Sequence, residues 1–320
     1  MLIAYFLYKG LVFHYTQINE RSRFIGIREV REKYMAFFTE KYQDKNRSEV
    51  EALVASDSFV MKDILGCLDE FPQCGWLVKE DDHILAVGVY TGIGTKTSMT
   101  LYVDPEKRRT GIGTLLLNTL EQEMRLEGIR EAVCDYLVND TEKEFLKHHG
   151  YQSWFHSNLM TYSGERLPSS SFDISSYTDS NYMKVQKIYS EAFHRMRVSV
   201  GLKSELSKPS EDERESYARN AKDILVMRVD DEIKASARIE GNEIDSIAVA
   251  VDQQGKGYGK TLLAHAVNLL LDRGNPEITL WVVEGNPART LYEHAGFIAC
   301  RRHEFVHKIL FIWPAVRIHW

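Results

Sequence analysis

The sequence predicts an α/β protein of two similar domains, each a mixed, mostly antiparallel sheet with helices on both faces. Three observations lead to this fold class. The chain repeats itself at a distance of 146 residues, each copy has a glycine-rich loop between a strand and a helix, and hairpin-like strands precede each loop. The segments Val103–Tyr151 and Val249–Phe297 align without a gap. We therefore place the first repeat at residues 1–165 and the second repeat at residues 166–320.

The aligned segments share residues in helices and strands as well as in the loop, so the lengths of these elements are also kept. The shared pairs are Val103/Val249, Gly111/Gly257, Gly113/Gly259, Leu116/Leu262, Leu117/Leu263, Gly128/Gly274, Glu131/Glu277, His148/His294 and Gly150/Gly296.

Size and composition are those expected for two soluble domains. The chain has 320 residues, of which 44% are hydrophobic and 27% are charged, and its net charge of −6 gives no general attraction to nucleic acid or to membranes. The four cysteines lack both zinc-site spacing and disulfide density, so we expect no metal site and a cytoplasmic location. The apolar segment Met1–Phe13 is too short to span a bilayer and lacks the basic start and cleavage site of a signal peptide.

Both repeats are expected to contain the same elements in the same order, separated by the linker Ser163–Ser171 with its boundary near Pro168. In the first repeat the patterns predict a strand at Leu11–Ile18, a helix at Arg21–Tyr42, strands at Gly75–Lys79, His83–Tyr90 and Ser98–Val103, a helix at Thr114–Glu127 and a strand at Ala132–Leu137. In the second they predict Phe172–Tyr177 (strand), Asn181–Phe193 (helix), Ile224–Val229, Ile233–Glu240 and Glu243–Val251 (strands), Lys260–Arg273 (helix) and Ile278–Val283 (strand).

The glycine loops are typical of an anion site. Glycines between a strand and a helix let backbone N–H groups approach a phosphate at the positive end of the helix. A purely structural role, relief of crowding at the corner, is the alternative. The nucleoside-triphosphate loop fits poorly, because its first glycine would stand at Gln254, and Gly255 is one residue too close to Gly259 and Lys260. The dinucleotide fingerprint would need a glycine at Lys260.

The loops resemble the signature of the Gcn5-related N-acetyltransferases, which is Gln or Arg, two residues, Gly, any residue, and Gly or Ala. Gln254, Gly257 and Gly259 fit this signature in the second repeat, and Arg108, Gly111 and Gly113 fit it in the first. A second signature of the family appears in full near the end of the chain. Its residues are Asn286, Ala288, Leu291, Tyr292, Gly296 and Phe297.

The resemblance implies that the loop N–H groups bind the pyrophosphate of acetyl-coenzyme A (acetyl-CoA), with the pantetheine arm along the preceding strand. Both loops are candidates for this. In the second repeat the implied cofactor-binding residues are Val249, Gln254, Gly255, Lys256, Gly257, Tyr258, Gly259, Lys260 and Asn286. In the first repeat they are Val103, Arg108, Arg109, Gly111, Ile112 and Gly113.

Two residues of the second repeat are candidates for catalysis. Tyr292 is similar to the family's general acid for the departing thiolate, and a core tyrosine is the alternative interpretation. Asn286 can cap its helix, Pro287 suits the first helical position, and Gly296 suits a left-handed end. Glu243 is the first choice for the group that takes the amine proton, ahead of Asp245, and a solvated strand-end acid is the alternative.

The first repeat departs from the pattern, since Leu146 stands in the place of Tyr292 and Thr97 in the place of Glu243. It could bind the coenzyme unproductively, shape a substrate cleft or use another donor such as Tyr136. We expect the second repeat to transfer acetyl from acetyl-CoA to a primary amine of a small molecule or peptide, by direct attack in a ternary complex. A non-catalytic coenzyme A sensor is the alternative, and a nucleotide hydrolase using Lys260 and Thr261 is a weaker third. The sequence leaves the acceptor and the oligomeric state open.

Overall fold

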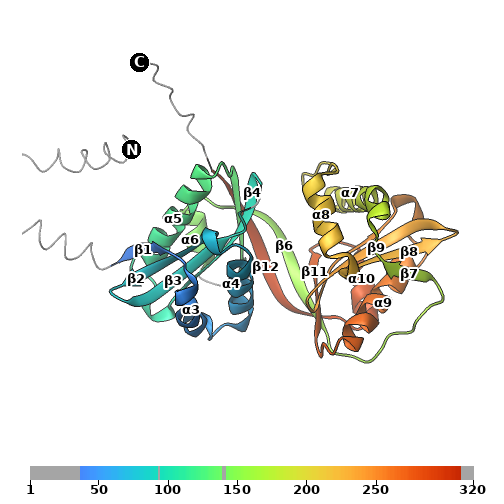
Figure 1. The fold of residues 1–320 in the computed structure, drawn as a ribbon, viewed down its shortest axis with the longest axis horizontal. Coiled ribbons are helices and arrows are strands. Elements are labelled where there is room, and N and C mark those ends of the chain that lie inside the picture. The colour runs from blue at the N-terminus through green and yellow to red at the C-terminus, as the bar shows by residue number, and fades with distance from the viewer. Residues whose placement is uncertain (1–36, 93, 139–141, 311–320) are drawn as a thin grey trace, which may run out of the picture. The chain divides into compact units, whose positions relative to one another are not determined.

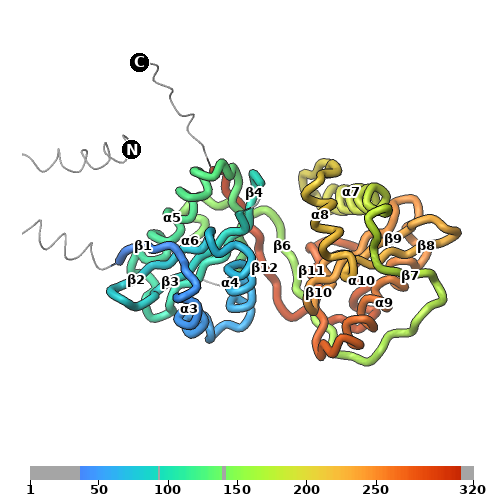
Figure 2. Tube along the Cα trace, viewed as in Figure 1, coloured from blue at the N-terminus to red at the C-terminus, as the bar shows by residue number. Residues whose placement is uncertain are grey.

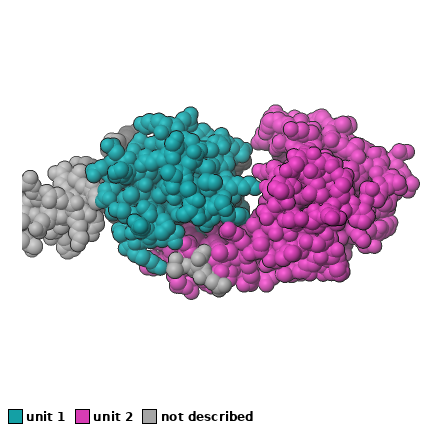
Figure 3. Space-filling view, turned by 90° about the horizontal axis from the view of Figure 1, so that it is seen from below, with its two compact units in different colours: residues 1–134, 308–320 teal, residues 135–307 magenta. Residues whose placement is uncertain are grey.

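The computed structural model describes residues 37–92, 94–138 and 142–310. The chain forms two compact units, which are coloured separately in Figure 3. Unit 1 comprises residues 1–134 and 308–320, and unit 2 comprises residues 135–307. The segment Met1–Phe13, the expected strand Leu11–Ile18 and most of the expected helix Arg21–Tyr42 lie outside the described residues.

Unit 1 contains strands in the order β1–β2–β3–β4–β5 (Figure 1). Neighbouring strands from β1 to β4 are antiparallel, whereas β4 and β5 are parallel. Helix α5 packs closely on β3, because a Cβ atom at Gly88 would lie only 2.7 Å from Leu120. The bounds are β1 Phe38–Lys41, α3 Arg47–Val54, α4 Ser58–Glu70, β2 Gly75–Glu80, β3 His83–Tyr90, β4 Lys96–Val103, α5 Ile112–Leu126 and β5 Glu131–Leu137, the last of which continues into unit 2.

One expectation for unit 1 is wrong. The helix expected at Arg21–Tyr42 does not extend over its last residues, because Phe38–Lys41 forms strand β1. This strand pairs with β2, Phe38 opposite Lys79 and Lys41 opposite Trp76. The helical spacing of apolar residues therefore does not decide the structure here, because an available sheet edge supplies hydrogen-bond partners for the extended backbone.

Unit 2 contains strands in the order β12–β6–β11–β10–β9–β8–β7. All neighbours are antiparallel except β10 and β11, which are parallel. The bounds are α6 Glu142–His148, β6 Gln152–Tyr162, β7 Asp173–Ser176, α7 Tyr182–Ser199, α8 Glu211–Arg219, β8 Ile224–Val229, β9 Glu232–Glu240, β10 Glu243–Val249, α9 Tyr258–Asp272, β11 Ile278–Val283, α10 Ala288–Ala295 and β12 Ile298–Ile309.

The sheet of unit 2 has an apolar core on each face. On one face, alternate residues of β9 (Ala235, Ala237 and Ile239) pack with the apolar side of α9. On the other face, residues of α7 and α8, among them Tyr189 and Tyr217, pack over β8 and β10. The expected arrangement of a mixed sheet between helices is confirmed for this unit (Figure 1). Because side chains alternate along a strand, Arg238 points toward α7 and α8.

The division into two units differs from the division into two repeats. Strand β6 belongs to the first repeat but lies in unit 2, where it pairs with β11 on one side and β12 on the other (Figure 2). The end of the second repeat returns to unit 1. There the Leu310 N–H donates to the Arg130 carbonyl over 2.7 Å, and Lys308 Nζ lies 2.7 Å from a carboxylate oxygen of the buried Glu121.

Most other expected elements occur within a few residues of their predicted bounds. The two hairpins are present as β2–β3 and β8–β9, and β11 has the predicted bounds. The linker Ser163–Ser171 contains no helix or strand. It is nevertheless fixed along α9, because Asn268 accepts from the Leu167 N–H and donates to the Leu167 carbonyl, both over 2.8 Å.

Candidate active site

The two glycine loops have the same backbone conformation. Gly257 and Gly111 precede α9 and α5 in the left-handed region, with φ of 86° and 94°. Two residues earlier, Gly255 has a φ of 80°, and its counterpart Arg109 adopts a φ of 66° despite its side chain. In this part of the described chain no side chain caps the first turn of either helix. The first-turn N–H groups are thus left for a ligand or solvent.

The Gln or Arg of each loop signature braces the loop against the strand before it. Gln254 Nε2 donates to the Val249 carbonyl, and Arg108 Nε donates to the Val103 carbonyl, each over 3.3 Å. The same bond from two different side chains explains why either residue type serves at this position. Both side chains were expected among the cofactor-binding residues, and the structure gives them a role in holding the loop.

The loop of the second repeat leaves room where a phosphate is expected. A Cβ atom at Gly257 or Gly255 would meet nothing within 4 Å. A Cβ atom at Gly259 would lie 3.6 Å from Val249 and 3.7 Å from Leu291 of α10. Of the other residues predicted for this loop, Gln254, Lys256 and Lys260 are exposed, whereas Val249 and Tyr258 are half-buried.

The loop of the first repeat is similarly accessible. A Cβ atom at Gly111 would meet nothing within 4 Å, and Arg108 and Arg109 are exposed. Val103 and Gly113 are half-buried, and Ile112 is buried in the place of the half-buried Tyr258. Tyr136, considered as another proton donor, is itself buried. Burial raises the pKa of Glu304, but hydrogen bonds from Tyr136 and Ser153 outweigh it and hold that pKa below its usual value, so the Tyr136 hydroxyl already has a partner.

In the second repeat, the strands next to the loop pair only where they begin. Among the described residues, the register of β10 and β11 is confined to Glu243 opposite Thr279. The Thr279 N–H also donates to the Asn242 carbonyl over 3.1 Å. Strand β10 then has a bulge between Ile244 and Ser246, which places Asp245 in an extra position. The backbone of β10 beyond the bulge is thus available to a ligand that lies along the strand.

Tyr292 lies on a short helix with both ends fixed. The Asn286 side-chain oxygen accepts from the Ala288 N–H over 3.0 Å, and Gly296 ends the helix with a φ of 101°. The left-handed end expected at Gly296 is confirmed. At the other end Pro287 lies one residue before the first helical residue, Ala288, and the Asn286 side chain binds the N–H of Ala288 from the residue before Pro287. Tyr292 is 8% exposed, and burial raises its pKa to about 12. Its hydroxyl therefore keeps its proton throughout the neutral range.

The two candidate proton acceptors differ in position. Glu243 is half-buried at the paired beginning of β10. Asp245 is exposed at the bulge, where Ser246 Oγ lies 2.9 Å from its carboxylate and 3.3 Å from the hydroxyl of Tyr189. Since a serine hydroxyl has one proton, Ser246 can donate to Asp245 while accepting from Tyr189. Burial raises the pKa of Tyr189, so it stays a donor.

Sequence reasoning missed Arg238, which lies beside this group. Arg238 Nε is 3.6 Å from the Asp245 carboxylate, and its guanidinium carbon is 5.4 Å from the centre of the Tyr217 ring. Burial lowers the pKa of Arg238, but Asp245 and the neighbouring tyrosines outweigh this and raise it overall. The only signal in the sequence is a charge within the apolar alternation of Ala235–Ile239.

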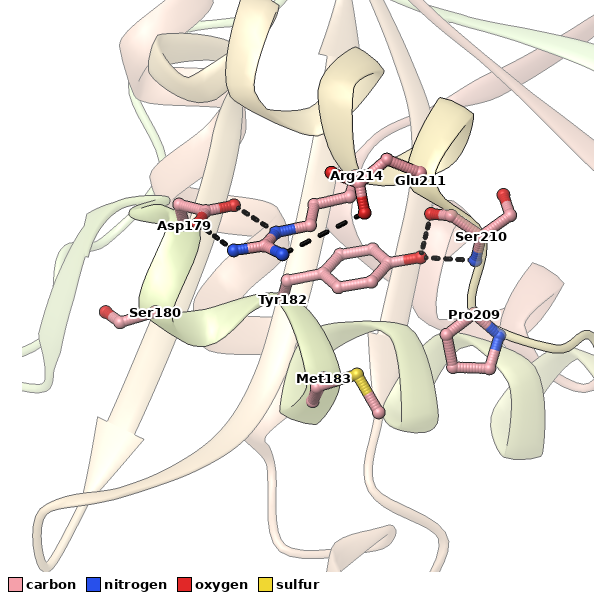
Figure 4. A pocket seen from close by; sticks show the side chains of 8 residues that line it. All are labelled: Asp179, Ser180, Tyr182, Met183, Pro209, Ser210, Glu211 and Arg214. Atoms are coloured by element: carbon pink, nitrogen blue, oxygen red, sulfur yellow. Dashed lines mark hydrogen bonds and ion pairs between the residues drawn. The ribbon is translucent and has the colours of Figure 1, made fainter.

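A separate pocket of about 410 Å³ lies between the first turns of α7 and α8 (Figure 4). It is lined by Asp179, Ser180, Tyr182, Met183, Pro209, Ser210, Glu211 and Arg214. Its polar groups bind one another: Arg214 Nε donates to Asp179 over 2.8 Å, and the Ser210 N–H donates to the Tyr182 hydroxyl over 2.9 Å. None of the predicted site residues lines it, so this pocket is distinct from the candidate active site.

Within residues 37–92, 94–138 and 142–310, no group of three or more His, Cys, Asp or Glu side chains is arranged to hold a metal ion. In the same ranges no helix has the length and apolarity that crossing a bilayer requires.

The chain is similar to known acetyltransferases. It is 25% identical over 234 residues to the mycothiol acetyltransferase of Clavibacter sepedonicus, which covers 68% of this chain and 74% of that protein. The crystal structure of a GCN5-related N-acetyltransferase from Sphaerobacter thermophilus has a TM-score of 0.70 at 19% identity, covering 88% of this chain and 98% of that one. A tandem GNAT protein from the clavulanic acid biosynthesis pathway has a TM-score of 0.60 at 14% identity, covering 87% and 99%.

These two structures support the fold. The sequence model described as "Acetyltransferase (GNAT) family" matches residues 27–151 and again residues 184–297, which together are most of the chain. The protein therefore belongs to the Gcn5-related N-acetyltransferase (GNAT) family, with one GNAT region in each repeat.

Proposed function

We propose that the second repeat, residues 166–320, transfers the acetyl group of acetyl-CoA to a primary amine of a small molecule or peptide. The observation that carries this proposal is the contact between the loop and α10. Leu291 lies where a Cβ atom at Gly259 would touch it, at 3.7 Å. The residue before Tyr292 in α10 is thus close to the start of α9, so the helix that carries the proposed proton donor packs against the glycine loop.

The coenzyme is held by backbone groups of the loop. Its pyrophosphate accepts hydrogen bonds from N–H groups around Gly257, where the start of α9 adds positive partial charge. Lys256 and Lys260 are exposed beside the loop and add positive charge. The pantetheine arm then follows β10 from Val249 toward the bulge, along backbone that β11 does not pair with.

The reaction proceeds by direct attack. The neutral amine nitrogen attacks the thioester carbonyl carbon, a C–N bond forms and the C–S bond breaks. The amine gives up one proton, directly or through water, to Glu243, with Asp245 at the bulge as the second candidate. The thiolate of coenzyme A takes one proton from the Tyr292 hydroxyl, whose raised pKa keeps it protonated until this step. No covalent acetyl-enzyme is formed.

The first repeat, residues 1–165, has a different role. Its loop keeps the left-handed Gly111 and the Arg108 brace, but Leu146 cannot donate a proton. We infer that it binds coenzyme A without turnover or serves as a framework for the second repeat. The alternative for the whole protein, a coenzyme A sensor without activity, is favoured only by this retained loop.

The test incubates the purified protein with acetyl-CoA and each of a panel of primary amines, and measures the coenzyme A thiol that is released. The panel includes the acceptor of mycothiol acetyltransferase, because a relative bears that name. Thiol release that depends on an amine supports acetyl transfer, and mass spectrometry identifies the acetylated nitrogen. Saturable acetyl-CoA binding with no thiol released by any amine would establish the sensor instead.

A further inference from the structure

Arg238 and Asp245 form a pair of opposite charges at the β10 bulge, on the sheet face that α7 and α8 cover. Ala237 and Ile239, the residues on either side of Arg238 in β9, pack with α9 on the opposite face. The pair is accessible to solvent, since the side chains of Arg238 and Asp245 are 40% and 38% exposed. A small molecule approaching the bulge from this face meets both charges.

The guanidinium of Arg238 is held in place without being saturated. The Tyr217 ring fixes it by a cation–π contact at 5.4 Å, and Tyr217 itself is only 2% exposed. The 3.6 Å to Asp245 is an ion-pair distance, too long for a good hydrogen bond. In the described part of the chain, no second carboxylate lies within ion-pair distance of Arg238. Arg238 also donates a hydrogen bond to the Tyr217 hydroxyl. Since the guanidinium has five N–H donors, one bond to Tyr217 and the ion pair with Asp245 leave others for a ligand.

The fold itself does not require this pair. In the second repeat Ser246 stands opposite Arg238, and in the first repeat the equivalent register position places Thr100 opposite Val89. Met99 of the first repeat occupies the place of Asp245. Val89 and Met99 are both buried. The same pair of strands is therefore built with apolar side chains where no acceptor is expected to bind, so packing alone does not explain Arg238 and Asp245.

We propose that the acceptor is an amine that also carries a carboxylate, as amino acids and short peptides do. This inference rests on the proposed function. The planar guanidinium of Arg238 binds the carboxylate through two parallel hydrogen bonds, and Asp245 orients the amine. The short distance between the two side chains matches an acceptor whose amine and carboxylate are separated by a few bonds. Ser246 and Tyr189 hold Asp245 while the acceptor binds.

The test compares amino acids with their carboxamides as acceptors for the full-length protein, using the twenty standard amino acids and the matching amides. We expect at least one amino acid to have a kcat/KM about tenfold or more above its amide, because the neutral amide offers the Arg238 guanidinium neither a negative charge nor two equivalent acceptor oxygens. In Arg238→Gln the KM for that amino acid should rise by about tenfold or more, so that the ratio of kcat/KM between the amino acid and its amide should approach one. The KM of Arg238→Lys for the amino acid should lie between those of the parent protein and Arg238→Gln. Lysine keeps the positive charge but cannot form the two parallel hydrogen bonds of a guanidinium.

Two controls separate a failure of this inference from other failures. Arg219→Gln, an exposed change on α8, should leave the amino-acid preference unaltered. Calorimetric titration with acetyl-CoA should give the same affinity for Arg238→Gln and the parent protein, which shows that the variant is folded. If amino acids and their amides react at equal rates, and Arg238→Gln has the same rates as the parent protein, the acceptor does not need a carboxylate. The proposed acetyl transfer is not contradicted by that result. Absence of thiol release with every amine overturns both.

Discussion

The ring of Tyr162 packs against Gly296, although the two residues belong to different repeats. A Cβ atom at Gly296 would lie 3.2 Å from Tyr162 Cε2. The Tyr162 ring is also 5.2 Å from the centre of the Phe297 ring, which in turn lies 6.2 Å from the ring of Tyr292. Strand β6 of the first repeat thus sets the position at which the helix carrying Tyr292 ends. The second repeat depends on the first for the geometry of its proposed general acid.

This contact predicts a stability difference between two glycine substitutions. Gly296→Ala combines a left-handed backbone, which costs roughly 1–2 kcal/mol for a residue with a Cβ atom, with a close approach to Tyr162. Gly274→Ala has the same backbone strain, with φ of 82°, and no atom within 4 Å of its Cβ position. Gly296→Ala should therefore reduce the free energy of unfolding in urea more than Gly274→Ala does. Equal losses of unfolding free energy in the two variants would show that the Tyr162 ring moves away from a Cβ atom at residue 296 without a cost in stability.

Tyr292→Phe tests the proposed general acid. The change removes one hydroxyl and keeps the ring that packs near Phe297, so the fold and the affinity for acetyl-CoA should persist. Turnover should fall by roughly 10²-fold, the lower end of what a positioned proton donor contributes. The measurement is kcat for amine-dependent thiol release beside the calorimetric affinity. Unaltered turnover removes Tyr292 from the mechanism, whereas lost affinity would indicate a binding role.

Alkaline stability depends on the same hydroxyl. Burial raises the pKa of Tyr292 to about 12, above the value of about 10 in the unfolded chain. Its contribution to stability is fully present below pH 10 and is lost as the pH rises toward 12, because only the unfolded state then releases the proton. The shift corresponds to about 3 kcal/mol at most. The unfolding free energy of Tyr292→Phe should decline less than that of the parent between pH 10 and 12. Parallel curves would mean that Tyr292 ionises normally in the folded protein.

The elements near the site could be predicted because the information is local. Gly257 and Gly296 have positive φ, as glycine at the end of an element indicates. The Asn286 side chain accepts a hydrogen bond from the N–H of Ala288 at the start of α10, as asparagine before a helix indicates. The nearly continuous apolar run Ile278–Val283 indicates a buried strand without knowledge of its neighbours. These features need no knowledge of distant partners.

What could not be predicted depends on contacts between distant segments. Periodicity reports which face of a strand is buried but not which strand lies next to it, so nothing in Gln152–Tyr162 indicates pairing with β11 and β12 of the other repeat. The strand Phe38–Lys41 was missed for the same reason. Asp245 was considered only as an acid two residues from Glu243. The bulge that brings it to Arg238 appears only once β9 and β10 are in register.

Matched glycine substitutions distinguish the two loops. Glutamate at residue 257 or residue 111 projects a carboxylate into open space at the start of α9 or α5, where the diphosphate is expected. Repulsion between like charges should then abolish coenzyme binding at that loop, and the backbone strain is the same at both sites. Gly257→Glu should eliminate amine-dependent thiol release, whereas Gly111→Glu should retain it. Calorimetry with acetyl-CoA then counts the sites, because each variant should lose only the binding that its own loop provides. Thiol release that survives in Gly257→Glu and disappears in Gly111→Glu would move catalysis to the first repeat, despite Leu146.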